Sequence, residues 1–265
     1  MSSGRSICTC LALLLLSATS ALYAAPPENC SLATLNGSYG FYGQTPASLV
    51  MDPVMRVAIV GITRFDGKGH LSGASISNME GWGAGEVATF EGTYTVNSDC
   101  TYSGEHTGDG ETLHFVGTIA GSGMSQQMRF VVTDPGWVAL GFERKISPAG
   151  CSLATLKGSY ALFGEGTVTG LTPPAPMSHV GSLTFDGAGN FFGSDTTMLG
   201  GAMFPDTFIG SYTVTEECLV TANIHSDIAG DVQEMGWIVG EGESTEEHLI
   251  VTNPGFLFLE ATRKQ

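Results

Sequence analysis

Cys30-Ser-Leu-Ala-Thr-Leu-Asn-Gly-Ser-Tyr39 occurs a second time as Cys151-Ser-Leu-Ala-Thr-Leu-Lys-Gly-Ser-Tyr160, 121 residues further along the chain. Five more blocks return in the same order, displaced by 118 to 121 residues: Phe65–Gly67 as Phe185–Gly187, Gly92–Val96 as Gly210–Val214, Cys100 as Cys218, Thr133–Gly136 as Thr252–Gly255, and Arg144–Lys145 as Arg263–Lys264. Matched blocks in a single order identify an internal duplication. The chain of 265 residues therefore contains one unit of roughly 115 residues twice.

Each unit is predicted to form about eight short β-strands. In the second copy we expect them near Gly158–Gly166, Met177–Phe185, Asn190–Met198, Thr207–Val214, Leu219–Asp227, Val232–Val239, Glu247–Thr252 and Phe256–Arg263. In the fourth of these segments, Phe208, Gly210 and Tyr212 alternate with Thr207 and Ser211. This period of two is typical of a strand with one buried and one wet face.

Turn-forming residues separate the expected strands. Asp-Gly within Phe65–Gly67 and Phe185–Gly187 supplies the positive φ that a tight reversal needs. Asp-Pro-Gly and Asn-Pro-Gly have the same role before the last strand of each unit. The segments are therefore expected to pair as successive hairpins.

Eight sequential strands joined by hairpins are typical of an up-and-down antiparallel barrel, which closes on itself. Two-sheet sandwiches fit the same strands less well, because we find no long crossover connection. We therefore expect an all-β chain with two tandem barrels, over residues 26–147 and 148–265. The short linker Ile146–Gly150 predicts that the barrels are docked together and not flexibly tethered.

The N-terminal segment has the pattern of a cleavable signal peptide. Arg5 precedes an apolar run from Ile7 to Leu16, and small residues follow it. We expect cleavage near Ala24 or Ala25, and hence a secreted or periplasmic protein. The apolar run is too short to span a membrane as a helix, and no later stretch is long enough, so we expect no membrane span.

The composition limits the partners of the protein. Asp and Glu number 26 against 10 Lys and Arg, giving a formal net charge of −16. Such a chain has few cations with which to bind phosphates, so we expect no nucleic-acid partner. The acidity keeps a secreted protein soluble, and selective cation binding is the alternative that this composition leaves open.

Four cysteines follow the expected signal peptide. Because each unit carries two of them at equivalent positions, we expect the disulfides Cys30–Cys100 and Cys151–Cys218. Zinc binding is the other interpretation, but the spacing has no Cys-x-x-Cys pairs and no accompanying histidine cluster. We therefore predict neither a metal site nor a cofactor.

Recognisable catalytic motifs are absent from the sequence, including the Gly-x-Ser-x-Gly, His-Glu-x-x-His and P-loop patterns. Two ionisable residues nevertheless replace apolar ones on faces predicted to point into the second barrel. His179 takes the place of Ile59, and Glu234 takes the place of Phe115. A buried histidine and carboxylate need a partner or a ligand, and together they are suited to general acid–base chemistry. A strand bulge or a shifted register is the alternative, and it would place both groups in solvent at the rim.

His179 and Glu234 are therefore the candidates for catalysis. Tyr160 and Tyr212 join them as candidates for ligand binding, although their recurrence as Tyr39 and Tyr94 favours a packing role. Four other histidines lack the spacing of metal ligands and are expected at the surface: His106, His114, His225 and His248.

The repeated blocks Cys-Ser-Leu-Ala-Thr-Leu-x-Gly-Ser-Tyr, Leu-Thr-Phe-Asp-Gly-Ala-Gly-Asn and Gly-Ser-Tyr-Thr-Val-x-x-x-Cys resemble those of exported bacterial proteins built from tandem β repeats. This resemblance covers both units and implies export and architecture, but no activity. In strand number and length each unit is also similar to calycin-type barrels, namely lipocalins and the allene oxide cyclase and dirigent group. That similarity concerns the fold alone.

Three functions follow from these observations as hypotheses. The first is a non-catalytic secreted protein that binds a small apolar ligand in a barrel cavity, which the inward glycines Gly181, Gly210 and Gly236 are expected to enlarge. The second is a structural or surface-interaction protein with filled barrels. The third is a cofactor-free isomerase, cyclase or hydrolase acting in the second barrel. An enzyme is the least favoured of the three.

Overall fold

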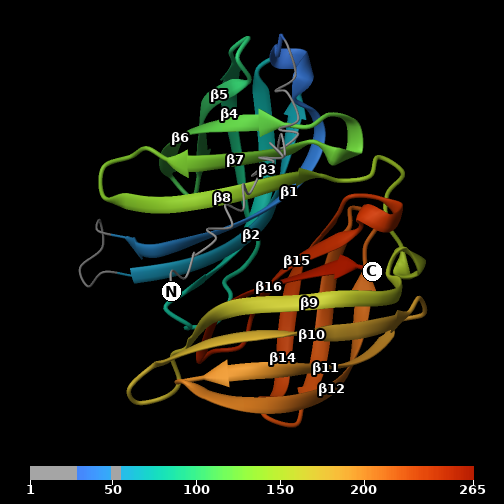
Figure 1. Ribbon diagram of the computed structural model, residues 1–265. Helices are drawn as coiled ribbons and strands as arrows, with labels where there is room; N and C mark the ends of the chain where they lie inside the picture. Colours follow the sequence, from blue (N-terminus) through green and yellow to red (C-terminus); the bar gives the residue numbers. More distant parts are fainter. Residues whose placement is uncertain (1–28, 49–54) are drawn as a thin grey trace, which may run out of the picture.

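The protein is described by a computed structural model that covers residues 29–48 and 55–265 (Figure 1). The expected signal peptide, residues 1–25, lies outside this part of the chain. The first half forms β1 (Asn36–Ser48), β2 (Met55–Asp66), β3 (His70–Met79), β4 (Ala88–Val96), β5 (Thr101–Gly108), β6 (Glu111–Ala120), β7 (Gln127–Val132) and β8 (Trp137–Lys145). The second half forms β9 (Lys157–Val168), β10 (Ala175–Asp186), β11 (Asn190–Leu199), β12 (Ala202–Val214), β13 (Leu219–Ser226), β14 (Gly230–Val239), β15 (Glu246–Val251) and β16 (Phe256–Lys264). Four short 3-10 turns complete the described elements: Leu32–Thr34, Gly123–Ser125, Leu153–Thr155 and Gly242–Ser244.

Each half closes into an eight-stranded antiparallel barrel. Every strand pairs with its neighbour in sequence, and closure comes from β1 with β8 in the first barrel and β9 with β16 in the second. Figure 1 shows the two barrels in contact, the first in blue to green and the second in yellow to red. The predicted barrels are confirmed, and the sandwich alternative is wrong because neither sheet has a free edge.

The predicted Asp-Gly hairpins close in the same way in both barrels. One carboxylate oxygen of Asp186 accepts the N–H groups of Ala188 and Asn190, and Gly187 adopts a φ of 76°. Asp66 and Gly67 repeat this arrangement in the first barrel. An aspartate followed by a residue with positive φ is therefore what reverses the chain between the second and third strands of each unit.

Disulfides join the two expected cysteine pairs, Cys30 with Cys100 and Cys151 with Cys218. Each bridge connects the segment that enters a barrel to the turn after its fourth strand. The bridges close loops of 70 and 67 residues along the chain. Each barrel is therefore cross-linked within itself.

The barrels are docked through the outer face of β1–β3 on the first and of β14–β16 on the second. Val60, Ile76 and Ile250 belong to one buried apolar cluster that spans both barrels and are at most 1% exposed. The side-chain amide of Asn78 donates hydrogen bonds to the carbonyl oxygens of Val251 and Phe256, at 3.0 and 2.7 Å. The expected docking is confirmed, and it rests on apolar burial with paired polar groups.

On the second barrel the matching face is more polar, although Val180, the counterpart of Val60, and its neighbour Phe163 remain apolar and exposed. Ile62 and Ile76, buried at the interface, correspond to the exposed Ser182 and Thr196 on β10 and β11. A serine or threonine gains little from losing water, so this change suits a free surface. The duplication thus produced two barrels with one scaffold but different outer faces.

Candidate functional site

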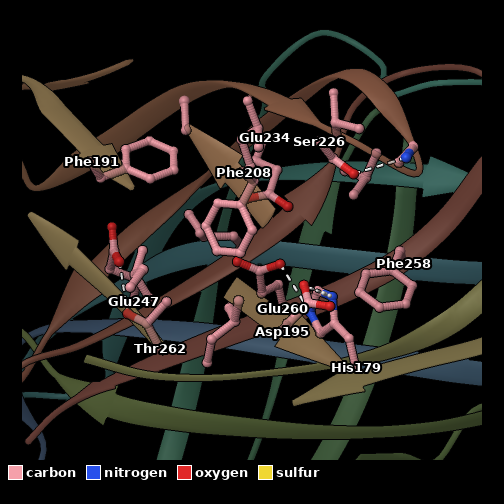
Figure 2. Close-up of a pocket in the computed structure, with 18 of the residues that line it drawn as sticks. His179, Phe191, Asp195, Phe208, Ser226, Glu234, Glu247, Phe258, Glu260 and Thr262 are labelled. Carbon is pink, nitrogen blue, oxygen red and sulfur yellow. Dashed lines mark hydrogen bonds and ion pairs between the residues drawn. The ribbon is translucent and has the colours of Figure 1, made fainter. Parts of the chain in front are cut away.

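The interior of the second barrel contains a cavity of about 70 Å³, counted as the space open to the centres of water-sized spheres. A single water needs about 10–15 Å³ by this measure, so the cavity holds several waters or a small ligand. Its polar lining comprises His179, Asp195, Thr197, Asp206, Ser226, Glu234, Glu247, Glu260 and Thr262. Phenylalanines and aliphatic residues supply the remaining walls, and Figure 2 shows Phe191, Phe208 and Phe258 among the polar groups.

His179 on β10 lies between two carboxyl groups. Its Nε2 is 3.1 Å from Glu260 of β16, and its Nδ1 is 3.6 Å from Asp195 of β11. Thr197 donates a 2.8 Å hydrogen bond to the other oxygen of Asp195 and so holds that carboxyl group in place. The rings of His179 and Phe258 also meet in a T-shaped arrangement, with 5.0 Å between their centroids.

A glycine makes the contact between His179 and Glu260 sterically feasible. Both residues lie opposite Gly164 on β9, the strand between β10 and β16. A Cβ at Gly164 would lie 2.5 Å from Nε2 of His179. The missing side chain therefore lets two residues meet across the intervening strand.

Burial and charge act on His179 in opposite directions. Loss of water alone would lower the pKa of the imidazole, but the neighbouring Glu260, Asp195 and Asp206 outweigh it and raise the pKa above its ordinary value. Burial also raises the pKa of Asp195. The imidazolium is thus stabilised by the acids around it.

Two further acids that line the cavity have raised pKa values. Burial raises the pKa of Glu247 to about 8, against the hydrogen bond that it accepts from Thr262 at 2.7 Å. Burial, and then the nearby Glu260 and Glu247, raise the pKa of Glu234 well above its ordinary value. The environment of the cavity thus favours the protonated forms of both acids and of the neighbouring His179.

Asp206 on β12 has one satisfied and one unsatisfied oxygen. Ser226 donates a 2.5 Å hydrogen bond to Oδ2, and the oxygen of Ser226 itself accepts the N–H of Ala229 at 2.8 Å. Oδ1 is buried and has no hydrogen-bond partner among the described residues. Such an acceptor in a polar cavity is suited to a donor from a bound molecule or water.

The first barrel has none of these six ionisable groups at the matching positions. His179, Asp195, Asp206, Glu234, Glu247 and Glu260 correspond to Ile59, Ser75, Ala88, Phe115, Met128 and Gly141. The strand pairing supports this alignment, because Asp195 lies opposite Asp206 as Ser75 lies opposite Ala88. The two barrels thus share a scaffold but differ in the chemistry of their interiors.

Both candidates for catalysis point into the second barrel, so the alternative of a solvent-exposed rim is wrong for them. Glu234 is 4% exposed, and the His179 side chain is 9% exposed. They do not pair directly with each other, because the nearest carboxyl group to His179 is that of Glu260. Glu260, which the sequence analysis did not select, contacts His179 and lies near Glu234. Asp195, Asp206 and Glu247 were missed as well, although comparing the two copies position by position would have found them.

The two tyrosine candidates differ in position. Tyr212 lines the cavity, but its hydroxyl donates to the carbonyl oxygens of Leu153 and Leu156. Tyr160 is fully buried outside the cavity lining and packs edge-on against Phe185. Both residues therefore connect parts of the scaffold.

Two histidines expected at the surface lie elsewhere. His248 is 2% exposed, because its outward-facing ring is covered by Tyr42 of the other barrel, with 4.5 Å between ring centroids. His106 points into the first barrel and lies 4.8 Å from the ring centroid of Phe90. Strand register decides that His106 points inward, and barrel docking decides that His248 is covered. Neither could be predicted from the spacing of the histidines.

Inward glycines do not enlarge the cavity as expected. A Cβ on Gly210 would lie 2.3 Å from the ring of Phe191, and one on Gly236 would lie 1.8 Å from the carbonyl oxygen of His248. At Gly181 the neighbouring atoms belong to Ser194 and Asp195. Rings and backbone from adjacent strands fill the space that each missing side chain leaves.

Gly236→Ala is therefore expected to lower the free energy of unfolding by about 1–3 kcal/mol, because the new methyl group meets rigid backbone. The matched control is Gly170→Ala, where the nearest atom is 3.4 Å away and the change should stay within about 0.5 kcal/mol. Urea unfolding of both variants measures the difference. Equal stability of the two variants would contradict the close packing around Gly236.

Metal-binding clusters and membrane-spanning helices are both absent from the described residues. No group of three or more His, Cys, Asp or Glu side chains is arranged to hold a metal ion in residues 29–48 and 55–265. In the same part of the chain, no helix is long and apolar enough to cross a membrane.

Comparisons with known proteins add little to this geometry. No protein-family model matches the chain, and no curated protein matches it. A solved structure of a protein provisionally named AttH, from Nitrosomonas europaea, aligns over 86% of this chain and 92% of its own. The two share 8% identity with a TM-score of 0.28, and a similarity at this level supports no argument about fold or function.

Proposed function

We propose that the protein binds a small molecule inside its second barrel, while the first barrel is a filled scaffold. The observation that supports this most strongly is the set of six buried ionisable groups that the first barrel lacks. Burying so many acids is unfavourable unless they pair with other protein groups or with a bound ligand. Because the first barrel forms the same fold without them, folding alone does not account for their presence.

The cavity walls favour a ligand with an apolar part. Phe191, Phe208 and Val232 face the same space as the acids. A molecule in this cavity would place its apolar body against these residues and its polar end against the carboxyl groups. The ligand we propose is therefore small and amphipathic, not purely apolar.

Export is part of the proposal. Two disulfides are typical of proteins that work outside the cytoplasm, in an oxidising environment. The expected signal peptide leads to the same compartment. A carrier or receptor for a small molecule in the periplasm or medium fits both features.

A cofactor-free acid–base enzyme is the second candidate. His179 lies between two carboxyl groups, one of them at 3.1 Å, and burial raises the pKa of Glu234, which lies near Glu260. This combination is suited to moving a proton on a bound substrate, as an isomerase, cyclase or hydrolase would require. His179→Gln separates the two candidates, because loss of turnover with retained ligand affinity would favour the enzyme.

Glu234→Phe tests the binding function by copying the residue at the same position of the first barrel. The larger apolar ring should fill the cavity and remove ligand binding. Protein purified from the organism that encodes it, examined by native mass spectrometry with extraction of bound molecules, is expected to carry one small ligand per chain. The Glu234→Phe variant should lose that ligand.

Glu143→Thr is the matched control, because it replaces a buried acid of the first barrel by the residue found in the second, Thr262. This variant should retain the ligand. An unliganded mass for the wild-type protein would contradict the proposal and favour two filled barrels with a structural or surface role.

A further inference from the structure

We propose that the ligand of the second barrel is an organic ammonium ion, an alkylamine with a short apolar chain. This inference rests on the proposed binding function and names its ligand class. It goes beyond the apolar ligand expected from the sequence. Three features of the cavity support it independently: its charge, an unsatisfied acceptor and its walls.

The charge of the lining is strongly asymmetric. Five carboxylic acids line the cavity, from β11, β12, β14, β15 and β16. His179 is the basic group among the described lining residues, which include no Lys or Arg. A cationic ligand beside these acids would favour their ionised forms and pair with them, whereas an anionic ligand would be repelled by any of them that is ionised.

The hydrogen-bonding pattern also favours a donor. Oδ1 of Asp206 is buried without a partner, and the residue is 7% exposed. Its other oxygen is already bonded to Ser226, so the carboxyl group is held in place. An ammonium group carries three N–H donors and no acceptor, which matches a lining composed mainly of acceptors. A carboxylate ligand offers acceptors alone, and an alcohol offers a single donor.

Aromatic walls lie next to the acids. Phe191 and Phe208 line the same cavity as Glu234 and Glu260, and all four are labelled in Figure 2. Phe191 and Phe208 are in contact, 6.3 Å between ring centroids. An alkyl chain gains from contact with these rings, and an ammonium group is attracted to an aromatic face. The size of the cavity limits the chain to a short one.

The test uses three probes with the same six-carbon chain and different head groups: hexylamine, 1-hexanol and hexanoate. Each is titrated calorimetrically into the full, disulfide-bonded protein at pH 7. Hexylamine is expected to bind with a Kd at least 10-fold lower than either of the other two. Asp206→Asn, which preserves shape and removes the charge, should weaken hexylamine binding about 10-fold or more and leave hexanol binding unchanged.

Two controls place the binding in the second barrel. Glu234→Phe should abolish hexylamine binding, and Glu143→Gln, a buried acid of the first barrel outside the cavity lining, should leave it unchanged. Hexylamine binding that survives Glu234→Phe would place the amine on the acidic surface and overturn the inference.

The remaining outcomes separate this inference from the binding function. Tighter binding of hexanol or hexanoate, lost in Glu234→Phe, would overturn the amine class and leave the binding function intact. Binding of none of the three probes would overturn the amine class. Together with an unliganded mass for the native protein, it would overturn the binding function too.

Discussion

Raising the pH from 5 to 8 is expected to lower the free energy of unfolding by several kcal/mol. Burial raises the pKa of Glu247 and of Glu143 from 4.5 to about 8. Between these values the folded protein holds protons that the unfolded chain releases, so unfolding becomes more favourable as the pH rises. Each such group contributes a slope of about 1.4 kcal/mol per pH unit.

Glu234 and His179 act in the same direction, because their pKa values are also raised in the folded state. Burial lowers the pKa of His248, whose effect is opposite in sign but confined to pH values below its ordinary pKa of 6.5. The decline should therefore be clearest above pH 6.5. Urea unfolding followed by tryptophan fluorescence at several pH values measures it.

Replacing each acid by the residue at the matching position of the other barrel shows how much that acid contributes to the pH dependence of the free energy of unfolding. Glu247→Met takes the residue of the first barrel, Met128, and Glu143→Thr takes that of the second, Thr262. Each should flatten the pH dependence, and Glu247→Met should increase stability at pH 8 by removing a buried acid. Variants with the same slope as the wild type would show that these two acids are hydrated in solution.

Removing the Cys151–Cys218 disulfide is expected to destabilise the protein by about 4 kcal/mol, through the entropy that its 67-residue loop regains on unfolding. For a chain of this size, that corresponds to a decrease in Tm of about 10 °C. Differential scanning calorimetry of the Cys151→Ala/Cys218→Ala variant measures the change.

The Cys30→Ala/Cys100→Ala variant is the matched control, since its loop of 70 residues predicts nearly the same loss. Similar losses in both variants would show that the two bridges stabilise their barrels equally. A Tm unchanged by either double substitution would contradict the assignment of these bridges as structural cross-links.

The fold was predictable because its determinants are local and occur twice. Asp-Gly turns, alternating strands and two cysteines per unit recur at matched positions, and each has a direct structural consequence. The strand boundaries were less predictable where two signals compete. Pro205 argues against a strand, yet β12 begins at Ala202 and includes it, paired with Thr196.

The candidate site was predictable in part for the same reason. His179 and Glu234 were found because they lie in clearly alternating strands, where an inward position can be assigned. Asp206 was missed because the predicted strand began at Thr207, after the proline. Glu260 and Glu247 differ from Gly141 and Met128 of the first copy and were detectable by that comparison, but their contacts depend on the register of β15 and β16, which pair with strands the sequence does not specify.

The different interiors of the two barrels suggest how the duplication was used. One copy has an interior filled largely by aromatic rings, in which Phe41 lies over Gly61 and Phe130 over Gly141, with Glu143 as a buried acid. The other contains the acids and the cavity. Keeping one filled barrel provides a stable partner for docking, so that the second can accommodate groups that are unfavourable for folding.

A crystal structure at 2 Å resolution or better, from protein purified without added ligand at pH 7, tests the central claim most directly. The account predicts electron density for a small molecule inside the second barrel, within hydrogen-bonding distance of Oδ1 of Asp206, and a cavity that holds water alone would contradict it. It also predicts a first barrel filled by its own aromatic rings. A second barrel whose side chains close the cavity, with Asp206 paired to another protein group, would contradict the account.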